Sequence, residues 1–487
     1  MPELQLPQTD RLYLNGAWQT AGGDRSIEVV NPATATVIAT VREASTADVN
    51  RAVDAAAAAL PAWSATPARV RADYINAIAE RILARKQELA ALITAEMGMP
   101  AQFCLPVQVE GPAAGMASYA DRAAGMETRS RAGTSLVLRE PVGVCGFITP
   151  WNYPLHQIVG KCAPALAAGC TMVLKPSELT PLDAIVFAEI IAAVGLPAGV
   201  FNLVQGTGVP VGEALVAHPR VDMVSFTGST RAGTRIAALA APSVKRVCLE
   251  LGGKSPYIIT EDADFAAAID FGVRQVMINS GQSCDALTRM LLPASRYEEG
   301  VALAREVTES LVVGDPTRAD TDIGPVSSRA QQQRVQEYLR SGLTAGARLV
   351  CGGPDAVDGQ PGGAFVRPTL FADVSNDMTI AREEIFGPVI AMIPYTDIDQ
   401  AVALANDTPY GLSGGVWAAD NDAAVAIARR LRAGQVYING GDFNYEAPFG
   451  GYKQSGNGRE WGDAGLEEFI EIKALQFAAG QDDNAAP

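Results

Sequence analysis

The chain has 487 residues, of which 48% are hydrophobic and 19% are charged. This length exceeds that of one ordinary domain, and the composition is typical of a globular α/β protein with two or three domains. The formal net charge of −16 argues against nucleic acid as a partner, because few basic side chains remain to neutralise a row of phosphates.

The amino-terminal segment has no basic stretch followed by an apolar run, so we do not expect a secretory signal. No apolar stretch approaches the roughly 20 residues of a membrane-spanning helix, and no membrane partner is expected. The seven cysteines are scattered, which favours a reducing, cytoplasmic location. Only two histidines are present and no cysteines have zinc-ligand spacing, so we expect no metal and a carboxylate as catalytic base.

The first strongly patterned stretch is predicted to be helical over residues 46–100. A start signal at Ser45 precedes apolar residues that recur at helical spacing. Residues 134–140 and 469–475 instead alternate between apolar and polar side chains, which predicts two short β segments. These segments could pair with each other or across subunits.

From Val142 onward, strand-like runs alternate with predicted helices over residues 155–168, 181–194 and 210–217. This alternation is typical of a parallel sheet with helices on its faces. A second α/β block is predicted over residues 256–452. Polar residues and glycines cluster at the predicted strand ends, where such sheets bind ligands.

Three short segments carry side chains suited to covalent catalysis. Gly-Gln-Ser-Cys places the Cys284 thiol at a turn, although a free cysteine is more often a buried structural residue. Glu250, in Leu-Glu-Leu-Gly-Gly-Lys, follows a strand-like run and suits a general base, although a glutamate in a loop is usually only solvated. Asn152, in Pro-Trp-Asn, offers a donor for an oxyanion beside the backbone N–H of Cys284, or else makes an Asx-turn.

Two further segments carry groups suited to a dinucleotide. Lys175 and Glu178, in Lys-Pro-Ser-Glu after a predicted strand, can hold the two hydroxyls of a ribose. The Glu178 carboxylate would repel a 2′-phosphate, which favours NAD over NADP. Gly228 and Ser229 lie where a helix is expected to begin and phosphates can bind, although the glycine spacing is not that of the Rossmann fingerprint.

The order and separation of these segments, together with two more, resemble the aldehyde dehydrogenase superfamily. The other two segments are Glu-Glu-Ile-Phe-Gly-Pro-Val from Glu383, and Pro-Phe-Gly-Gly-Tyr-Lys-Gln-Ser-Gly from Pro448, which Gly-Arg-Glu-Trp-Gly follows. The resemblance extends from about Leu12 to about Leu475, nearly the whole chain. Because Glu250 is present, the chain is most similar to the branch of the family that hydrolyses its acyl intermediate.

The resemblance assigns the nucleophile to Cys284, the general base to Glu250 and the oxyanion donor to Asn152. Lys161 and Glu460 match the pair that passes protons away from the base. In the implied reaction, the Cys284 thiolate attacks the aldehyde carbon, hydride leaves for the cofactor, and a thioester remains. Water activated by Glu250 then hydrolyses the thioester to the carboxylic acid.

The cofactor implied by the resemblance is NAD. Lys175 and Glu178 correspond to ligands of the adenosine ribose, and Ser229 corresponds to a pyrophosphate contact. Glu384 corresponds to the ligand of the nicotinamide ribose, and Phe386 would pack near the nicotinamide. The remaining expected cofactor contacts are Ile148, Thr149, Pro150, Trp151, Ser177, Gly208, Gly212, Phe226, Thr227, Gly228 and Leu251.

The family fold implies three parts. A Rossmann-like cofactor domain would comprise residues 1–122 and 142–253, and an α/β catalytic domain residues 254–452. A small β flap would comprise residues 123–141 and 468–480. In the family this flap extends a neighbour's sheet, so we expect a homodimer or homotetramer.

The partner is expected to be a small-molecule aldehyde with a bulky hydrophobic or aromatic tail. Gly160 stands where many relatives carry a large side chain, so the substrate tunnel should be wider there. Asp285 is either a charge at the tunnel mouth or a surface carboxylate. The expected substrate contacts are Tyr153, Gly160, Ser283, Asp285, Phe443 and Phe449.

Three alternatives to this reading differ in chemistry. A coenzyme A-acylating semialdehyde dehydrogenase would transfer the acyl group to a thiol instead of water. A non-catalytic binding protein would keep the scaffold without the reaction. A cysteine-dependent hydrolase would use the thioester chemistry alone, but the cofactor segments make hydrolysis a side activity at most.

Overall fold

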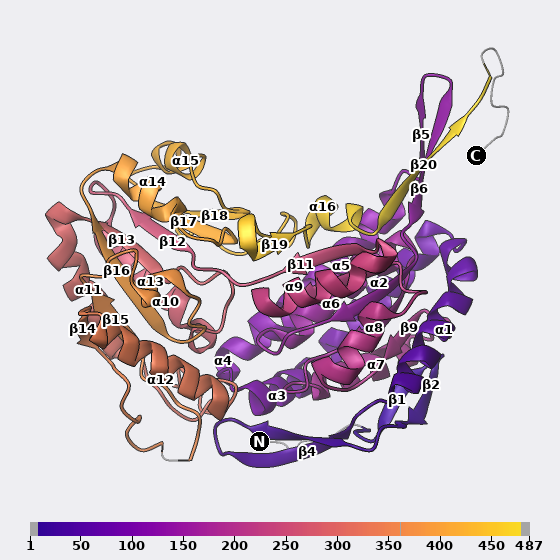
Figure 1. Cartoon of the computed structure of the whole chain (residues 1–487), viewed down its shortest axis with the longest axis horizontal. Coiled ribbons are helices and arrows are strands. Elements are labelled where there is room, and N and C mark those ends of the chain that lie inside the picture. Colours follow the sequence, from indigo (N-terminus) through magenta and orange to yellow (C-terminus); the bar gives the residue numbers. More distant parts are fainter. Residues whose placement is uncertain (1–7, 361, 479–487) are drawn as a thin grey trace.

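The computed structural model describes residues 8–360 and 362–478, which form two α/β lobes and a projecting arm (Figure 1). Within these residues the first lobe contains an eight-stranded sheet in the order β19-β11-β10-β7-β8-β9-β1-β2. Its five central strands are mutually parallel. The strands are β1 (Arg11–Leu14), β2 (Ala17–Thr20), β7 (Val144–Ile148), β8 (Thr171–Lys175), β9 (Phe201–Leu203), β10 (Met223–Thr227), β11 (Arg246–Glu250) and β19 (Gly456–Asn457).

The second lobe contains a seven-stranded sheet in the order β14-β15-β16-β13-β12-β17-β18, as far as the described residues show. Only the pairing of β14 with β15 is antiparallel. The α/β fold predicted from the alternation of elements is therefore confirmed. The strands are β12 (Pro256–Ile259), β13 (Arg289–Pro293), β14 (Arg348–Cys351), β15 (Thr369–Ala372), β16 (Val389–Tyr395), β17 (Ser413–Trp417) and β18 (Gln435–Ile438).

Side chains of the parallel strands enter hydrophobic clusters on both faces of each sheet. Phe147 and Ile148 are neighbours on β7, yet they belong to different clusters. Tyr257 and Ile258 on β12 divide in the same way. Burial of both faces is what a parallel sheet requires, because helices cover each side. The edges and ends of the strands are then the places left for a ligand.

The stretch predicted to be helical over residues 46–100 contains three helices. The first begins as predicted at Ser45, whose hydroxyl and Asp48 form a reciprocal capping box. It ends just before Pro67, because a proline disfavours helical geometry in the residue before it. The helices are α1 (Thr46–Ser64), α2 (Ala68–Ala84) and α3 (Lys86–Met97).

The other predicted helices of the first lobe agree with the structure to within a residue or two, with one exception. Residues 210–217 do not form one α-helix, because a π-helical turn, η2 (Gly208–Gly212), precedes α8 (Glu213–Ala217). The remaining helices are α4 (Ala101–Cys104), η1 (Leu105–Glu110), α5 (Gly111–Gly125), α6 (Pro154–Ala168), α7 (Leu182–Ala193), α9 (Thr230–Ala240) and η3 (Ala241–Ser243).

Helices also cover the second sheet. Figure 1 shows α10 and α11 beside the strands of this lobe, with α14 and α15 above them. The helices are α10 (Phe265–Met277), η4 (Ile278–Gly281), η5 (Ala294–Arg296), α11 (Tyr297–Ser310), α12 (Arg329–Thr344), α13 (Thr379–Arg382), α14 (Ile398–Asn406), α15 (Asn421–Ala428), η6 (Lys453–Ser455) and α16 (Gly462–Glu467).

The two predicted β segments pair with each other within one chain. A hairpin of β5 (Arg129–Ala132) and β6 (Ser135–Pro141) is joined by β20 (Ile470–Gln476), which lies antiparallel to β6. This three-stranded arm projects from the first lobe (Figure 1). One edge of β20 pairs with no other strand of the described chain, and Ile472 on it is 65% exposed. Residues 479 and 480 of the predicted flap lie outside the described residues.

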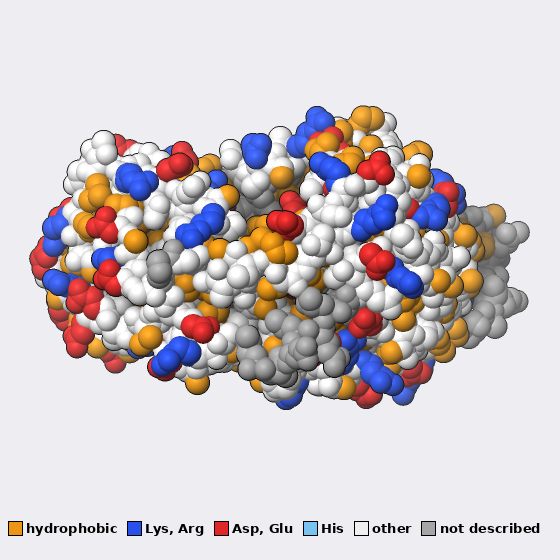
Figure 2. Space-filling view, turned by 90° about the horizontal axis from the view of Figure 1, so that it is seen from below, with side chains coloured by type: hydrophobic (Ala, Val, Ile, Leu, Met, Phe, Trp, Pro, Cys, Tyr) orange, Lys and Arg blue, Asp and Glu red, His pale blue; other side chains and the backbone are white. Residues whose placement is uncertain are grey.

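A separate hairpin of β3 (Ser26–Asn31) and β4 (Thr36–Arg42) connects the two lobes at their base, where the carbonyl of Pro32 accepts a hydrogen bond from the N–H of Ala364. Acidic and basic side chains are interspersed over the face that Figure 2 shows. Within the described residues, no helix is both long enough and apolar enough to cross a bilayer.

Candidate active site

The ends of four adjacent strands bring the predicted cofactor and catalytic residues into one row. Ile148 at the end of β7 is aligned with Lys175 at the end of β8 on one side and with Phe226 of β10 on the other. The next pair, Thr227 and Glu250, ends β10 and β11. Carboxyl ends of parallel strands meet at one edge of a sheet, so residues up to about 100 positions apart in sequence face the same space.

Lys175 is buried at this edge and is held in place by backbone oxygens. Its Nζ donates to the carbonyls of Pro176 and Gly206 at 2.8 and 2.7 Å and lies 3.5 Å from the Glu178 carboxylate. Burial lowers the pKa of Lys175. The Glu178 side chain remains 40% exposed, so its carboxylate is available to a ligand beside the lysine.

A second predicted contact lies at the start of α9. Ser229 is the N-cap of this helix, and its hydroxyl accepts a hydrogen bond from the N–H of Ala232 at 3.3 Å. The first N–H groups of an α-helix lack intrahelical partners and attract anions. Gly228 precedes the cap, and its N–H donates to the carbonyl of Glu250, which joins this turn to the end of β11.

Several other predicted cofactor residues lie around the same edge. The N–H of Thr149 donates to the carbonyl of Lys175, while its buried hydroxyl has no hydrogen-bond partner among the described residues. Ser177 is buried, and its hydroxyl accepts from the N–H of Leu179. Around them, the structure has Gly208 and Gly212 in η2, Pro150 and Trp151 after β7, and Leu251 after β11.

The loop before Cys284 has an unusual backbone. Asn279, Ser280 and Gly281 all have positive φ, between 53° and 74°. A Cβ at position 281 would lie 2.1 Å from the carbonyl oxygen of Gly387, so only glycine fits this close approach. The three residues turn the chain at the end of α10 and present the thiol beside the end of the first sheet.

Asn152 contacts this loop from the first lobe. Its side-chain Nδ2 donates to the carbonyl of Gln282 at 2.9 Å. Its own backbone carbonyl accepts from the side-chain amides of Asn279 and Gln108 at 2.9 and 3.0 Å. An amide nitrogen carries two hydrogens, so Nδ2 keeps one for another acceptor. Among the hydrogen bonds of the described residues, the backbone N–H of Cys284 donates to none, so two donors remain beside the thiol.

Glu250 ends β11 with its side chain 4% exposed, and neither carboxyl oxygen has a hydrogen-bond partner among the described residues. Burial and the Glu460 carboxyl raise the pKa of Glu250 well above its usual range. Lys161, which is fully buried on α6, forms an ion pair with Glu460 and donates to the hydroxyl of Thr227 at 2.7 Å. The structure thus brings the predicted base and the predicted proton-passing pair into one buried, electrostatically coupled group.

Cys284 is partly exposed, and several carboxyl groups lie near its thiol. Burial, followed by the nearby carboxyls of Asp285 and Glu250, raises the pKa of the thiol well above its usual value. The close packing of Gly253 against the carbonyl of Cys284, where a Cβ would lie 2.3 Å away, fixes the loop against the Leu-Glu-Leu-Gly-Gly-Lys segment. A thiolate therefore needs local stabilisation when it reacts.

Glu384 approaches the same segment from the second lobe. Its Oε1 accepts from the N–H of Gly253 at 3.0 Å, and a Cβ at Gly252 would lie 2.4 Å from its other oxygen. Burial raises the pKa of Glu384 to about 7. Phe386 packs edge-on against Trp151 with ring centroids 5.3 Å apart. Both predicted nicotinamide-side residues thus lie at the junction of the two lobes.

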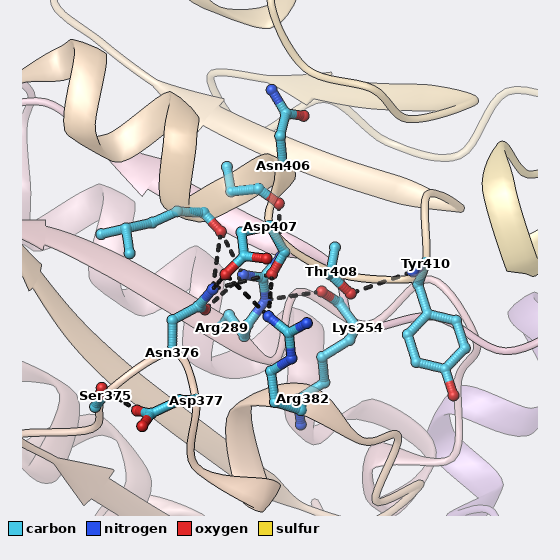
Figure 3. Close-up of polar contacts among 12 residues, drawn as sticks. Lys254, Arg289, Ser375, Asn376, Asp377, Arg382, Asn406, Asp407, Thr408 and Tyr410 are labelled. Carbon is cyan, nitrogen blue, oxygen red and sulfur yellow. Dashed lines mark hydrogen bonds and ion pairs between the residues drawn. The ribbon is translucent and has the colours of Figure 1, made fainter.

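A buried polar network supports this junction from behind (Figure 3). Arg289, at the start of β13, is fully buried and donates to the carbonyl of Lys254 at 3.0 Å and to Asn376 Oδ1 at 2.9 Å. It also donates to the carbonyls of Leu404 and Ala405. These bonds fix the end of the segment that carries Glu250. Burial lowers the pKa of Lys254 to about 7.

A cavity of about 790 Å³ opens onto Cys284. Five of the six predicted substrate residues line it, and apolar and aromatic side chains dominate the wall. Both neighbours of the cysteine are bonded to tyrosines there, because Ser283 and Tyr153 share a hydrogen bond and Tyr437 donates to Asp285 at 2.6 Å. The five predicted residues in the wall are Tyr153, Ser283, Asp285, Phe443 and Phe449.

The prediction that Gly160 widens the tunnel is wrong. Gly160 is buried on α6 and is not part of the described cavity wall. A Cβ at this position would lie 3.1 Å from the indole of Trp461, whose side chain is fully buried. The indole therefore occupies the space that the small residue leaves. Gly115 on α5 makes room for the same ring, since a Cβ there would lie 2.6 Å from it.

Sequence reasoning missed several wall residues, among them His156, Tyr437 and Tyr445. Tyr153 is the N-cap of α6, and His156 lies in the first turn of that helix. Proximity in sequence to the predicted tunnel residue Tyr153 could have identified His156. No comparable signal marks Tyr437, because its neighbourhood depends on the pairing of β18 with β17.

Comparisons with known proteins agree with this geometry. The family model described as "Aldehyde dehydrogenase family" matches residues 18–475. A 3-succinoylsemialdehyde-pyridine dehydrogenase from a Pseudomonas species is 49% identical over 469 residues, which cover 96% of this chain and 98% of that protein. A putative aldehyde dehydrogenase from Staphylococcus saprophyticus is 44% identical and covers 95% of this chain and 98% of its own length.

Solved structures are also similar over the whole chain. A crystal structure of a mutant aldehyde dehydrogenase C from Pseudomonas syringae, in complex with NAD+ and octanal, has a TM-score of 0.97 and 49% identity, covering 99% of this chain and 100% of that one. The Mycobacterium tuberculosis aldehyde dehydrogenase complexed with NAD+ has a TM-score of 0.96 and 43% identity, covering 98% of this chain and 100% of its own.

Proposed function

The chain belongs to the aldehyde dehydrogenase family, and we propose that it oxidises aldehydes with a long or ring-containing apolar tail to carboxylic acids, with NAD as cofactor. The observation that carries the proposal is the large cavity, lined largely by apolar and aromatic side chains, that reaches the partly exposed Cys284. Its volume of about 790 Å³ falls within the range of sites for small organic ligands and far exceeds what a two-carbon aldehyde would fill.

In the proposed reaction Cys284 attacks the aldehyde carbon as a thiolate. The free hydrogen of Asn152 Nδ2 and the backbone N–H of Cys284 hold the resulting oxyanion. Bound NAD would supply the acceptor for the hydride. A thioester on Cys284 then remains, and Glu250 takes a proton from the water that hydrolyses it.

Glu250 suits the role of base because it is buried and its carboxyl oxygens bond to no described residue. The elevated pKa brings it closer to neutral pH, where a general base works best. The ion pair of Lys161 and Glu460 lies beside it, and we infer that these residues carry its proton toward solvent. An available base for water favours hydrolysis over acyl transfer to coenzyme A.

The residues along the sheet edge fit a dinucleotide. Lys175 and Glu178 form an adjacent cation and carboxylate suited to ribose hydroxyls, and the start of α9 suits a pyrophosphate. The orphaned hydroxyl of Thr149 supports a ligand at this edge, since buried polar groups are almost always bonded. Glu384 would hold the second ribose.

The relatives support a bulky substrate. One similar protein is named for a pyridine-bearing semialdehyde, and the structure of another contains octanal. Both aldehydes have a long tail, which agrees with the size of the cavity in this chain. Gly160 no longer supports the proposal, because Trp461 fills the adjoining space.

The proposal is tested by following NADH absorbance with octanal, benzaldehyde-type aldehydes and acetaldehyde, and by identifying products with and without coenzyme A. We expect carboxylic acids as products, and higher kcat/KM for the large aldehydes. Cys284→Ala should abolish turnover and keep NAD binding, measured by calorimetry, because the thiol is separate from the sheet edge. A thioester of coenzyme A as the product, or turnover by the alanine variant, would overturn the mechanism.

We further propose a homo-oligomer in the cytoplasm. The unpaired edge of β20, with Ile472 exposed, suits pairing with a strand of another copy. All seven cysteines are free thiols, which is typical of a reducing compartment. Light scattering of the purified protein gives the oligomeric state, and a monomer at micromolar concentration would contradict the first part.

A further inference from the structure

We propose that His156 makes the enzyme select, among large aldehydes, those that carry a hydrogen-bond acceptor on or beside a planar ring. The inference rests on the proposed function and specifies its substrate class. The imidazole would donate its Nε2 hydrogen to a ketone oxygen or a ring nitrogen in the tail of the substrate. A purely alkyl tail would occupy the same cavity without that contact.

The imidazole lies in an aromatic box within the cavity wall. Its ring centroid is 5.4 Å from Phe443, 5.5 Å from Tyr445 and 4.9 Å from Trp461, and 6.1 Å from Tyr153. Phe443 and Tyr445 also pack against each other at 5.0 Å. Aromatic side chains in edge-to-face and tilted arrangements pack favourably against a further planar ring. The box therefore suits the ring of a substrate.

The hydroxyl groups of the cavity tyrosines already have partners. Tyr153 is bonded to Ser283, Tyr437 to Asp285, and Tyr445 to His156 Nδ1 at 3.3 Å. His156 Nε2, by contrast, takes part in no hydrogen bond among the described residues, and His156 is partly exposed to the cavity. It is thus the polar atom of the aromatic box that a substrate can still reach.

Three other side chains with N–H donors line the cavity, namely Gln157, Arg274 and Gln275, but none suits this role as well. Gln275 is held at the backbone, because its Oε1 accepts from the N–H of Leu287 at 2.9 Å. Gln157 is buried, and its Oε1 accepts from Lys161 Nζ at 3.4 Å, which ties it to the proton-passing pair. Arg274 is half exposed and forms an ion pair with Asp270 one turn earlier on α10. It belongs to the solvent side of the wall, where water competes for its hydrogen bonds.

The imidazole is uncharged at neutral pH, because burial and the nearby Lys161 lower its pKa to about 3. A neutral imidazole has one N–H donor and one acceptor nitrogen. In this proposal the phenol O–H of Tyr445 is the donor to Nδ1 in their 3.3 Å contact, which leaves the ring hydrogen on Nε2. The substrate must therefore offer an acceptor.

The test compares two aldehydes that differ by one acceptor, 4-phenylbutanal and 4-oxo-4-phenylbutanal, and a second pair, 3-phenylpropanal and 3-(pyridin-3-yl)propanal. We expect His156→Phe, which keeps a ring and loses the donor, to lower kcat/KM for the acceptor-bearing member of each pair about tenfold. It should leave the other member within about twofold. His156→Gln, which retains an N–H donor, should restore part of the preference.

Two control variants separate recognition from general damage. Phe443→Leu removes a ring of the box without a donor and should lower kcat/KM for both members alike. Tyr445→Phe should weaken the preference only partly. It keeps the imidazole but removes the hydroxyl that holds the ring hydrogen of His156 on Nε2. NAD binding and the melting temperature report whether each variant is folded.

Equal effects of His156→Phe on both members, or an unchanged preference, would overturn the inference while the aldehyde dehydrogenase reaction stands. Failure of the wild-type enzyme to oxidise any of the four aldehydes with NAD would instead overturn the proposed function, and the inference with it. Calorimetry of Cys284→Ala with butyrophenone and butylbenzene, which cannot react, gives an independent measure: only the ketone should lose affinity in the His156→Phe background.

Discussion

Replacing Asn152 with alanine removes the side-chain donor that would hold the oxyanion. In the structure its Nδ2 uses one hydrogen for the carbonyl of Gln282 at 2.9 Å and keeps the other free. The backbone carbonyl of Asn152 stays bonded to Asn279 and Gln108, so the loop should keep its position in the variant. The variant then loses mainly one of the two hydrogen-bond donors that are preorganised for the oxyanion.

Removal of one such donor typically costs about 2.7–4 kcal/mol of transition-state stabilisation, which is a 10²- to 10³-fold loss in kcat. Both the attack on the aldehyde and the hydrolysis of the thioester place negative charge on the same oxygen. We therefore expect the burst of NADH and the steady-state rate to fall together. The lost bond to Gln282 should add only about 0.5–1.5 kcal/mol of destabilisation.

The assay is rapid-mixing absorbance of NADH, followed by steady-state kcat and KM with the best aldehyde. NAD binding and the alkylation rate of the Cys284 thiol should stay within about twofold of the wild-type values, since neither involves an oxyanion. A kcat loss smaller than about fivefold would refute the assignment. Slow thiol alkylation would show that the loop, and not the donor, was damaged.

Three other expectations concern the cofactor, the fold and its pH dependence. Glu178→Gln should reduce the preference in kcat/KM for NAD over NADP at least about tenfold, because the 2′-phosphate no longer meets a carboxylate; an unchanged ratio contradicts this. Gly160→Ala should lower the free energy of unfolding by about 1–3 kcal/mol in denaturant titrations, because its Cβ would press on Trp461; a neutral effect would show that the indole can move. Burial raises the pKa of Asp183 to about 7, beside the likewise buried Glu96, so the native state favours the protonated carboxyl. This contribution to stability is complete below the ordinary pKa near 4 and is lost as the pH rises through about 7. The melting temperature of Asp183→Asn should therefore increase relative to that of the wild type between pH 5.5 and 8. A difference that stays constant over this range would exclude the assignment.

The positions of the candidate catalytic and cofactor groups at strand and helix ends could be predicted because each position depends on a local pattern. Glu250 and Lys175 each end a run of strand residues, and Ser229 precedes a helix. Parallel strands bring such ends to one edge whatever their separation in sequence. The alternation that predicts the strands therefore also predicts that these side chains meet.

The helical layer shows the limit of local patterns within one lobe. Apolar residues keep their helical spacing across Pro67 and Arg85, where the chain bends between α1, α2 and α3. The spacing of apolar residues predicts which face of a helix is buried, but it does not predict where the helix ends. The breaks are set by backbone geometry at single residues.

The shape of the substrate cavity was decided only by the tertiary structure. Gly160 predicted a wide tunnel, but the space beside it belongs to Trp461, 301 positions later in the chain. The box around His156 likewise depends on Phe443 and Tyr445, which reach it from the second lobe. Strand ends are specified by neighbours in sequence, whereas the volume beside a small residue is filled by whichever distant side chain the packing of the lobes brings there.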